Sequence, residues 1–109
     1  MTDKIVVLTT CDSEELAKRL ARHLVEQRLA ACVNVLSRAN SVFRWDDKIE
    51  DKAEWVLLIK SRRDLFATLR AEIQKIHTYD MPEMIAVPVV DGSEPYLGWV
   101  DDQLRGWGE

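Results

Sequence analysis

The chain has 109 residues, of which 47% are hydrophobic and 31% charged, and its formal net charge is −4. That length predicts a single domain over residues 1–109. The acidic balance disfavours a dedicated nucleic-acid binder and a protein anchored to anionic lipid. The sequence passes from Met1–Lys4 directly into Ile5–Leu8 without a signal-peptide pattern, and no apolar run is long enough to span a bilayer. These features predict a cytoplasmic protein whose two cysteines, too few for a disulfide framework, stay reduced.

The first third of the chain predicts a strand, a loop and a helix. Ile5–Leu8 is a short apolar run typical of a strand, and residues 9–13 follow it as a loop. Asp12 or Ser13 is suited to cap the helix, because a short oxygen-bearing side chain can accept from its first free N–H groups. Apolar residues then recur at helical spacing until residue 27 or 28, at Leu16, Ala17, Leu20, Ala21, Leu24 and Val25.

The middle of the chain predicts a long hairpin. Residues 30–36 begin a second strand, which resumes at residues 42–45 after a polar interval. Asp46 and Asp47 suit a tight turn, since Asp tolerates left-handed backbone geometry better than most residues. Residues 48–54 return as a charged arm that becomes a buried strand at residues 55–59. We therefore expect a hairpin with a polar tip and a base in the core.

The last part of the chain predicts a helix, a strand and a final helix. The first of these helices begins at Asp64 and carries Leu65, Leu69, Ile73 and Ile76 on one stripe. Residues 77–83 form a compact polar segment, and its Pro82 requires the helix to end earlier. Residues 84–90 are an almost unbroken apolar run, which predicts a strand covered on both faces. The final helix begins near Ser93, and Gly106 and Gly108 release the tail.

The predicted order of elements is β-α-β-β-α-β followed by a helix. This is the α+β, ferredoxin-like pattern, in which two helices pack on one face of an antiparallel sheet. The third strand places Leu57 and Ile59 on one side and Val56 and Leu58 on the other, so both faces of the sheet are apolar. An uncovered apolar face would make a single chain prone to associate. The pattern therefore predicts an obligate homo-oligomer.

Four functions are compatible with this fold, because ferredoxin-like domains serve many roles. A copper metallochaperone would carry a Cys-x-x-Cys pair after the first strand, but Cys11 has no second cysteine nearby, and Cys32 suits a small buried apolar residue. RNA binding would require aromatic residues on the central strands and a basic surface. A hydrolase built on His77, Tyr79 and Asp80 would lack a nucleophile motif or a glycine-rich loop.

The fourth function is a ligand- or metal-binding oligomer. Imidazole together with carboxylates suits divalent metals such as Cu(II) and Zn(II), and His77 lies close to Asp80 and Glu83 in the sequence. The structural alternative is that His77 ends the second helix, where a cation complements the helix dipole. The residues leave both interpretations open.

Five stretches of the chain resemble the CutA divalent-cation tolerance proteins. They are Ala30–Asn34, Ser41–Glu50, Ile59–Lys60, the pattern His77-x-Tyr79-x-x-Pro82-Glu83-x-Ile85-Ala86-x-Pro88, and Tyr96-Leu97-x-Trp99. The resemblance covers nearly the whole chain in order and spacing. It implies ferredoxin-like subunits in a tight homotrimer, similar to the PII-type signalling proteins, with a role in tolerance to divalent metals, chiefly copper.

The resemblance also implies a metal site and a cleft at the boundary between subunits. The ligands proposed for bacterial members are a cysteine at the end of the first strand and two adjacent histidines, and here Thr9 and Ile76 stand at two of those positions. His77, with Cys11 two residues beyond Thr9, is therefore the predicted metal site. The cleft is predicted to contain Trp45, Lys60, His77, Tyr79 and Glu83.

The sequence thus predicts a cytoplasmic homotrimer that is not an enzyme. It would bind copper, another divalent metal ion or a small anionic ligand where subunits meet, without an organic cofactor, nucleic acid or membrane. The alternative is a PII-like signalling or scaffold trimer that binds a small ligand or a protein partner at its interfaces.

Overall fold

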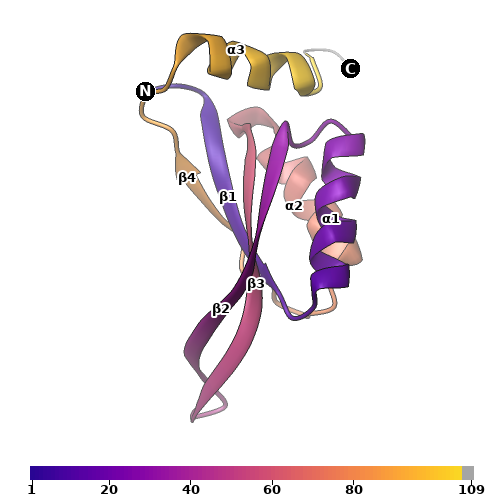
Figure 1. Cartoon of the computed structure of the whole chain (residues 1–109), viewed down its shortest axis with the longest axis vertical. Coiled ribbons are helices and arrows are strands. Elements are labelled where there is room, and N and C mark those ends of the chain that lie inside the picture. Colours follow the sequence, from indigo (N-terminus) through magenta and orange to yellow (C-terminus); the bar gives the residue numbers. More distant parts are fainter. Residues whose placement is uncertain (107–109) are drawn as a thin grey trace.

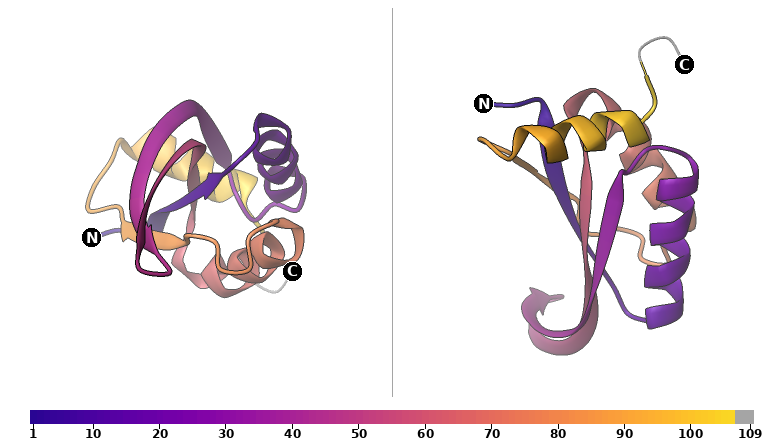
Figure 2. Two further views of the ribbon diagram at one scale, coloured as in Figure 1. Left: turned by 90° about the horizontal axis from the view of Figure 1, so that it is seen from below. Right: turned by 45° about the horizontal axis from the view of Figure 1, so that its top comes forward.

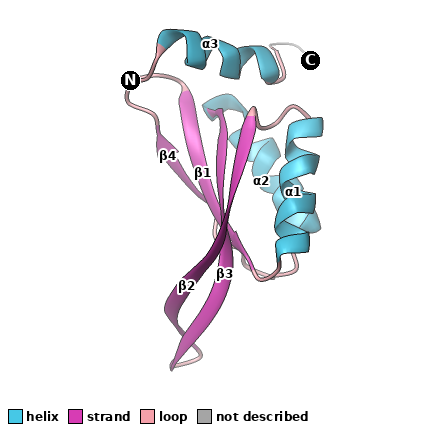
Figure 3. Cartoon of the chain, in the orientation of Figure 1, coloured by secondary structure: helices cyan, strands magenta, loops and turns pink. Residues whose placement is uncertain are grey.

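The computed structural model describes residues 1–106 and contains one four-stranded antiparallel sheet with three α-helices in that range. The elements follow the order β1 (Lys4–Cys11), α1 (Glu14–Glu26), β2 (Cys32–Trp45), β3 (Lys48–Arg62), α2 (Phe66–Ile76), β4 (Ile85–Pro88) and α3 (Glu94–Gln103), with a short 3-10 turn at Arg63–Leu65 before α2. The strand order is β2-β3-β1-β4, and both helices of the β-α-β-β-α-β core lie on one face (Figure 1; Figure 3). The predicted ferredoxin-like fold is confirmed.

The core lies between the sheet and the helices α1 and α2. Alternate residues of β1 and β3 point into it, and Val7, Leu57 and Ile59 have no exposed surface. The apolar stripe of α1 covers them, with Leu20 and Leu24 also fully buried. Ser13 caps α1, since its Oγ accepts a hydrogen bond from the Leu16 N–H at 3.1 Å.

Three strand boundaries differ from the predicted ones. β1 continues to Cys11, so Thr9 and Cys11 are buried strand residues and the prediction of a loop there is wrong. β2 is one continuous strand with a register shift between Leu36 and Ala39, where the sequence suggested a break. β4 spans only Ile85–Pro88, whereas residues 84–90 were predicted to be strand. It pairs with β1 over these four residues. Gly108, which was expected to release the tail, lies outside the described residues.

The sheet face opposite α1 and α2 is open in a single chain. Directly paired residues of neighbouring strands share a face, so Val6 and Val87 lie together on it, as do Leu8 and Ile85. Ile85 is 52% exposed and Val87 43% exposed. All of β4 is exposed in a single chain, so the cover predicted for both of its faces is not supplied by this chain and stays a prediction. We call this surface the open sheet face: Val6, Leu8, Leu36, Val56, Leu58, Ile85 and Val87.

The far halves of β2 and β3 leave the body as a two-stranded ribbon, which gives the molecule its 44 Å long axis (Figure 1). The ribbon curls at its end (Figure 2). Asp46 and Asp47 form the predicted turn, both with positive φ angles of 49° and 63°. The tip is not polar as predicted, because Trp45 and Ile49 are 52% and 64% exposed beside Val42 and Phe43.

Helix α3 crosses the end of the sheet where β1 begins and β3 ends (Figure 1). Val100 and Leu104 bury its inner side. Asp101 accepts hydrogen bonds from the Arg62 guanidinium and pairs with the Lys4 ammonium, each at 3.1 Å. Arg62 and Lys4 are themselves buried, so these pairs attach α3 to β1 and β3. No helix in the described range is long and apolar enough to cross a membrane.

Candidate functional site

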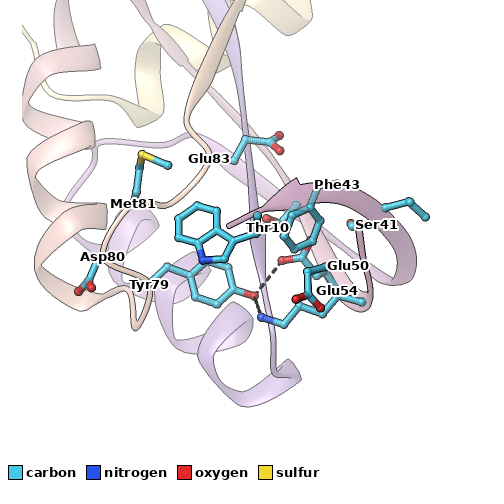
Figure 4. Close-up of a pocket in the computed structure, with 12 residues that line it drawn as sticks. Thr10, Ser41, Phe43, Glu50, Glu54, Tyr79, Asp80, Met81 and Glu83 are labelled. Atoms are coloured by element: carbon cyan, nitrogen blue, oxygen red, sulfur yellow. Dashed lines mark hydrogen bonds between the residues drawn. The ribbon is translucent and has the colours of Figure 1, made fainter. Parts of the chain in front are cut away.

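A cleft of about 830 Å³ lies between the β2–β3 ribbon, the end of β1 and the loop that joins α2 to β4 (Figure 4). Its volume is in the range of small-molecule sites. The walls combine aromatic and acidic side chains. The lining residues are Thr10, Ser41, Val42, Phe43, Trp45, Glu50, Lys52, Glu54, Tyr79, Asp80, Met81 and Glu83.

The ribbon supplies one wall through alternate residues. Glu50, Lys52 and Glu54 occupy every second position of β3 and so share one face. Phe43 is paired with Glu50, and Ser41 with Lys52, on the neighbouring strand. Val56 continues the same row of β3 residues, so the cleft is continuous with the open sheet face.

The α2–β4 loop supplies the opposite wall, and His77 holds that loop in place. Its Nδ1 accepts a hydrogen bond from the Tyr79 N–H at 3.0 Å, so the ring proton lies on Nε2. That Nε2–H donates to the Thr10 carbonyl oxygen at 2.7 Å. His77 is 8% exposed and is the C-cap residue of α2, so the predicted position at the end of this helix is confirmed, although the ring acts there through hydrogen bonds and not as a cation. Its two hydrogen bonds connect the loop to β1.

Tyr79 crosses the cleft and meets β3. Its phenol donates to Glu54 Oε2 at 2.8 Å, and the Lys52 ammonium donates to the phenol oxygen at 3.2 Å. The same ammonium lies 4.6 Å from the centroid of the Tyr79 ring. Burial, together with the hydrogen bond to Glu54, raises the pKa of Tyr79 above its ordinary value. The phenol is therefore a neutral donor at physiological pH.

Cys11 lies directly behind this wall. Its Sγ is 3.8 Å from His77 Nε2. Burial, with further contributions from Asp12 and Glu54, raises the pKa of the Cys11 thiol to about 11. A metal requires a thiolate and a free imidazole nitrogen. Here the thiol is neutral, and both nitrogens of His77 already have partners.

The donor groups of a single chain decide whether it can hold a metal ion. The described residues contain no group of three or more His, Cys, Asp and Glu side chains placed to hold a metal ion. Thr9 and Ile76, at the positions of the other ligands that the resemblance implied, offer a buried hydroxyl with no hydrogen-bond partner among the described residues and an apolar side chain. The residues of a single chain do not fit a metal ion, and the assignment of metal binding to His77 and Cys11 stays a prediction.

The structure brings together most of the residues predicted for the cleft. Trp45, Tyr79 and Glu83 line it, and His77 supports Tyr79 from behind. Lys60 lies elsewhere in the same chain, six residues along β3 from Glu54, or roughly 20 Å. It donates to the Asn34 side chain and lies 3.9 Å from Cys32 Sγ.

Sequence reasoning did not predict four lining residues that come from the ribbon, Phe43, Glu50, Lys52 and Glu54. A signal for them was present in the alternation of β3, because Glu50, Lys52 and Glu54 fall on the same face as Val56. No local sequence signal indicated that the α2–β4 loop would lie against this face.

Comparison with known proteins identifies the family. The family model described as "CutA1 divalent ion tolerance protein" matches residues 5–103. The divalent-cation tolerance protein CutA of Thermus thermophilus is 40% identical over 95 residues, which are 87% of this chain and 92% of the relative. The protein of that name from Pectobacterium atrosepticum is 39% identical over 96% of each chain.

Solved structures agree with these sequence matches. The cation tolerance protein of Thermus thermophilus superposes with a TM-score of 0.92 at 37% identity, covering 94% of this chain and 99% of that one. CutA1 of Oryza sativa gives a TM-score of 0.93 at 38% identity, over 95% of each chain.

Some relatives are longer proteins. This chain spans 56% of the length of the chloroplastic CutA protein of Arabidopsis thaliana, to which it is 40% identical over 101 residues. It spans 51% of the Mus musculus protein CutA. The family model nevertheless matches nearly all of the described chain, and the fold and the identities agree with it. The chain therefore belongs to the CutA1 divalent ion tolerance protein family.

Proposed function

We propose that this protein acts in tolerance to divalent cations as a homotrimer, and that copper or another divalent metal ion binds where subunits meet. Family membership supports the tolerance role. The observation that carries the proposal is the open sheet face, which is continuous with the cleft and leaves Ile85 and Val87 about half exposed in one chain. The proposed role is one of binding, and its proposed location is the cytoplasm.

Self-assembly follows from the cost of exposed apolar surface. Soluble monomers rarely expose large contiguous apolar patches. The open sheet face is such a surface in a single chain, since Ile85 and Val87 are 52% and 43% exposed on it. Packing between copies would remove it from water and would also cover the exposed strand β4.

Metal binding is placed at the boundary because one chain does not supply a complete set of ligands. Glu50 and Glu83 are carboxylates at the cleft, and carboxylate oxygens are common ligands of divalent cations. A neighbouring subunit would contribute the remaining donors. In this proposal Cys11 and His77 stabilise the wall of the cleft and do not bind the metal ion.

Two measurements test this proposal together. Sedimentation velocity at micromolar concentration should show a trimer, and calorimetry with Cu(II) and Zn(II) should show saturable binding by that trimer. Glu50→Gln and Glu83→Gln should weaken metal binding without changing the sedimentation coefficient. A stable, soluble monomer would contradict the assembly, and unchanged metal affinity in both variants would contradict the location of the site.

A PII-like ligand-binding or scaffold trimer is the second candidate, because the cleft has the size and the aromatic walls of an organic-ligand site. Four acidic residues, Glu50, Glu54, Asp80 and Glu83, and one lysine line it, so its charge favours a cation. The anionic ligand predicted from the sequence stays a prediction. Calorimetry with metal-free protein and small organic ions separates the two candidates, since only the second requires binding without metal.

A further inference from the structure

We propose that the cleft binds a small organic ammonium ion, with its charged group on the face of Tyr79 and its carbon chain against Trp45 and Phe43. This proposal goes beyond the metal role and does not depend on it, because every residue that carries it lies in one chain. It rests on a buried carboxylate without an ion pair, on a cation already seated at Tyr79, and on apolar walls around them.

The buried carboxylate is that of Glu54. Its residue is only 6% exposed, yet no Lys, Arg or His in the described range lies within ion-pair distance of it. Its hydrogen bond comes from the neutral phenol of Tyr79. A carboxylate that is nine-tenths buried is costly unless a cation compensates its charge. Glu54 therefore lacks a direct ion pair within the described range, and the Lys52 ammonium reaches it only through the Tyr79 phenol.

Lys52 shows where such a cation can sit. Its ammonium lies 4.6 Å from the centroid of the Tyr79 ring and 3.2 Å from the phenol oxygen. The face of an aromatic ring attracts ammonium groups through its quadrupole. Lys52 is exposed and attached to a flexible stem, so an incoming ammonium ion can displace it. Lys52 is then an internal competitor for the ligand.

The remaining walls suit an organic cation. Phe43, Trp45 and Met81 line the cleft with apolar surface, which suits a ligand that carries carbon as well as charge. A metal ion would require several donor atoms around one point, and no such group exists among the described residues of one chain. Separated carboxylates beside aromatic side chains are instead complementary to the charge and the carbon chain of an alkylammonium ion.

Competition with Lys52 predicts that two substitutions change the affinity for an alkylammonium ion in opposite directions. Butylammonium chloride is titrated by calorimetry into the metal-free protein in its native assembly, with sodium butyrate as the anionic control at equal ionic strength. Lys52→Met should tighten butylammonium binding by about threefold or more, since it removes a competing charge. Glu54→Gln keeps the shape of the side chain and should weaken binding about tenfold.

Lys18→Met is the matched control, because Lys18 is an exposed lysine on α1 that pairs with Glu14 away from the cleft. It should leave the affinity unchanged. Circular dichroism and sedimentation of each variant exclude misfolding as the cause of a loss. The proposal is overturned if butylammonium fails to bind both the wild type and Lys52→Met, if Lys52→Met weakens binding, or if butyrate binds in its place. The metal proposal has its own variants, Glu50→Gln and Glu83→Gln, and its own metal titration, so the failure of one proposal is distinguished from the failure of the other.

Discussion

The phenol of Tyr79 and the carboxylate of Glu54, 25 residues apart, form a 2.8 Å hydrogen bond across the base of the cleft. Tyr79 comes from the α2–β4 loop and Glu54 from β3, so this bond joins the two walls. Behind it, His77 connects the same loop to the end of β1 by a hydrogen bond to the Thr10 carbonyl oxygen. The shape of the cleft thus depends on two side chains that follow α2.

The contribution of His77 to stability can be measured directly. His77→Ala leaves the Thr10 carbonyl and the Tyr79 N–H without their partners, so we expect the free energy of unfolding to fall by about 1–3 kcal/mol. Urea denaturation at one fixed protein concentration measures it. His77→Asn keeps an acceptor close to the position of Nδ1 and should lose less. Equal losses in the two variants would contradict the role assigned to the Tyr79 N–H.

The Cys11 thiol predicts a loss of stability at alkaline pH. Its pKa is raised from 9.0 to about 11 in the folded chain, so folding favours the neutral thiol. The resulting stabilisation is complete below pH 9 and is lost as the pH rises towards 11, by about 2 kcal/mol in all. Denaturation of the wild type and of Cys11→Ala across this range should show the difference between them shrinking. A difference that stays constant with pH would contradict the prediction.

Asp101 predicts a loss of stability in acid. Burial by itself would raise the pKa of Asp101, but the hydrogen bonds from Lys4 and Arg62 outweigh it and hold the pKa below 3.8. The ionised carboxylate therefore stabilises α3 above the unfolded-state pKa, and this contribution disappears as the pH falls below it.

Asp101→Asn should cost about 1 kcal/mol at pH 7, a figure reduced because the side chain is 47% exposed to screening solvent. It should cost almost nothing at pH 2. Asp102→Asn, at the exposed neighbouring position on α3, is the control. Thermal unfolding of both variants at the two pH values measures the effect, and the same loss at both pH values would exclude an electrostatic origin.

The turn at the ribbon tip predicts a stabilising substitution. Asp47 has a φ angle of 63°, a left-handed conformation that glycine adopts without steric cost. Asp47→Gly should therefore raise the free energy of unfolding by roughly 0.5–1 kcal/mol, and Asp47→Ala should lower it. Chemical denaturation provides the measurement. Stabilisation by alanine as well would show that the removed charge, and not the backbone, is responsible.

The proposed assembly through the open sheet face predicts a variant that separates its copies. Val87→Asp places a charge on this face and should shift the sedimentation of the protein towards the monomer. Val25→Asp is a matched control on α1, because both valines are 43% exposed in one chain. It should leave the assembly intact. Dissociation by both variants, or by neither, would argue that this face is not where the copies meet.

The sequence by itself determined the succession of elements, because periods of 2 and 3.6 residues are local properties of the chain. It determined equally that β3 and β4 are apolar on both sides, and hence that one sheet face is left uncovered in a single chain. Its errors were local as well: the loop predicted at Thr9–Cys11 is strand because the partner residues Trp55–Leu57 extend the pairing with β3.

Only the tertiary structure decided which polar side chains meet. The charged arm of β3 has the alternation of any exposed strand, and nothing local shows that Glu54 would be buried beneath Tyr79. Lys60 and Glu83 were predicted to share a cleft between subunits, and within one chain the extended strand places Lys60 several residues away from Glu54. Such contacts depend on how far a strand extends and where a loop crosses it. Both result from packing between segments that are distant in the sequence.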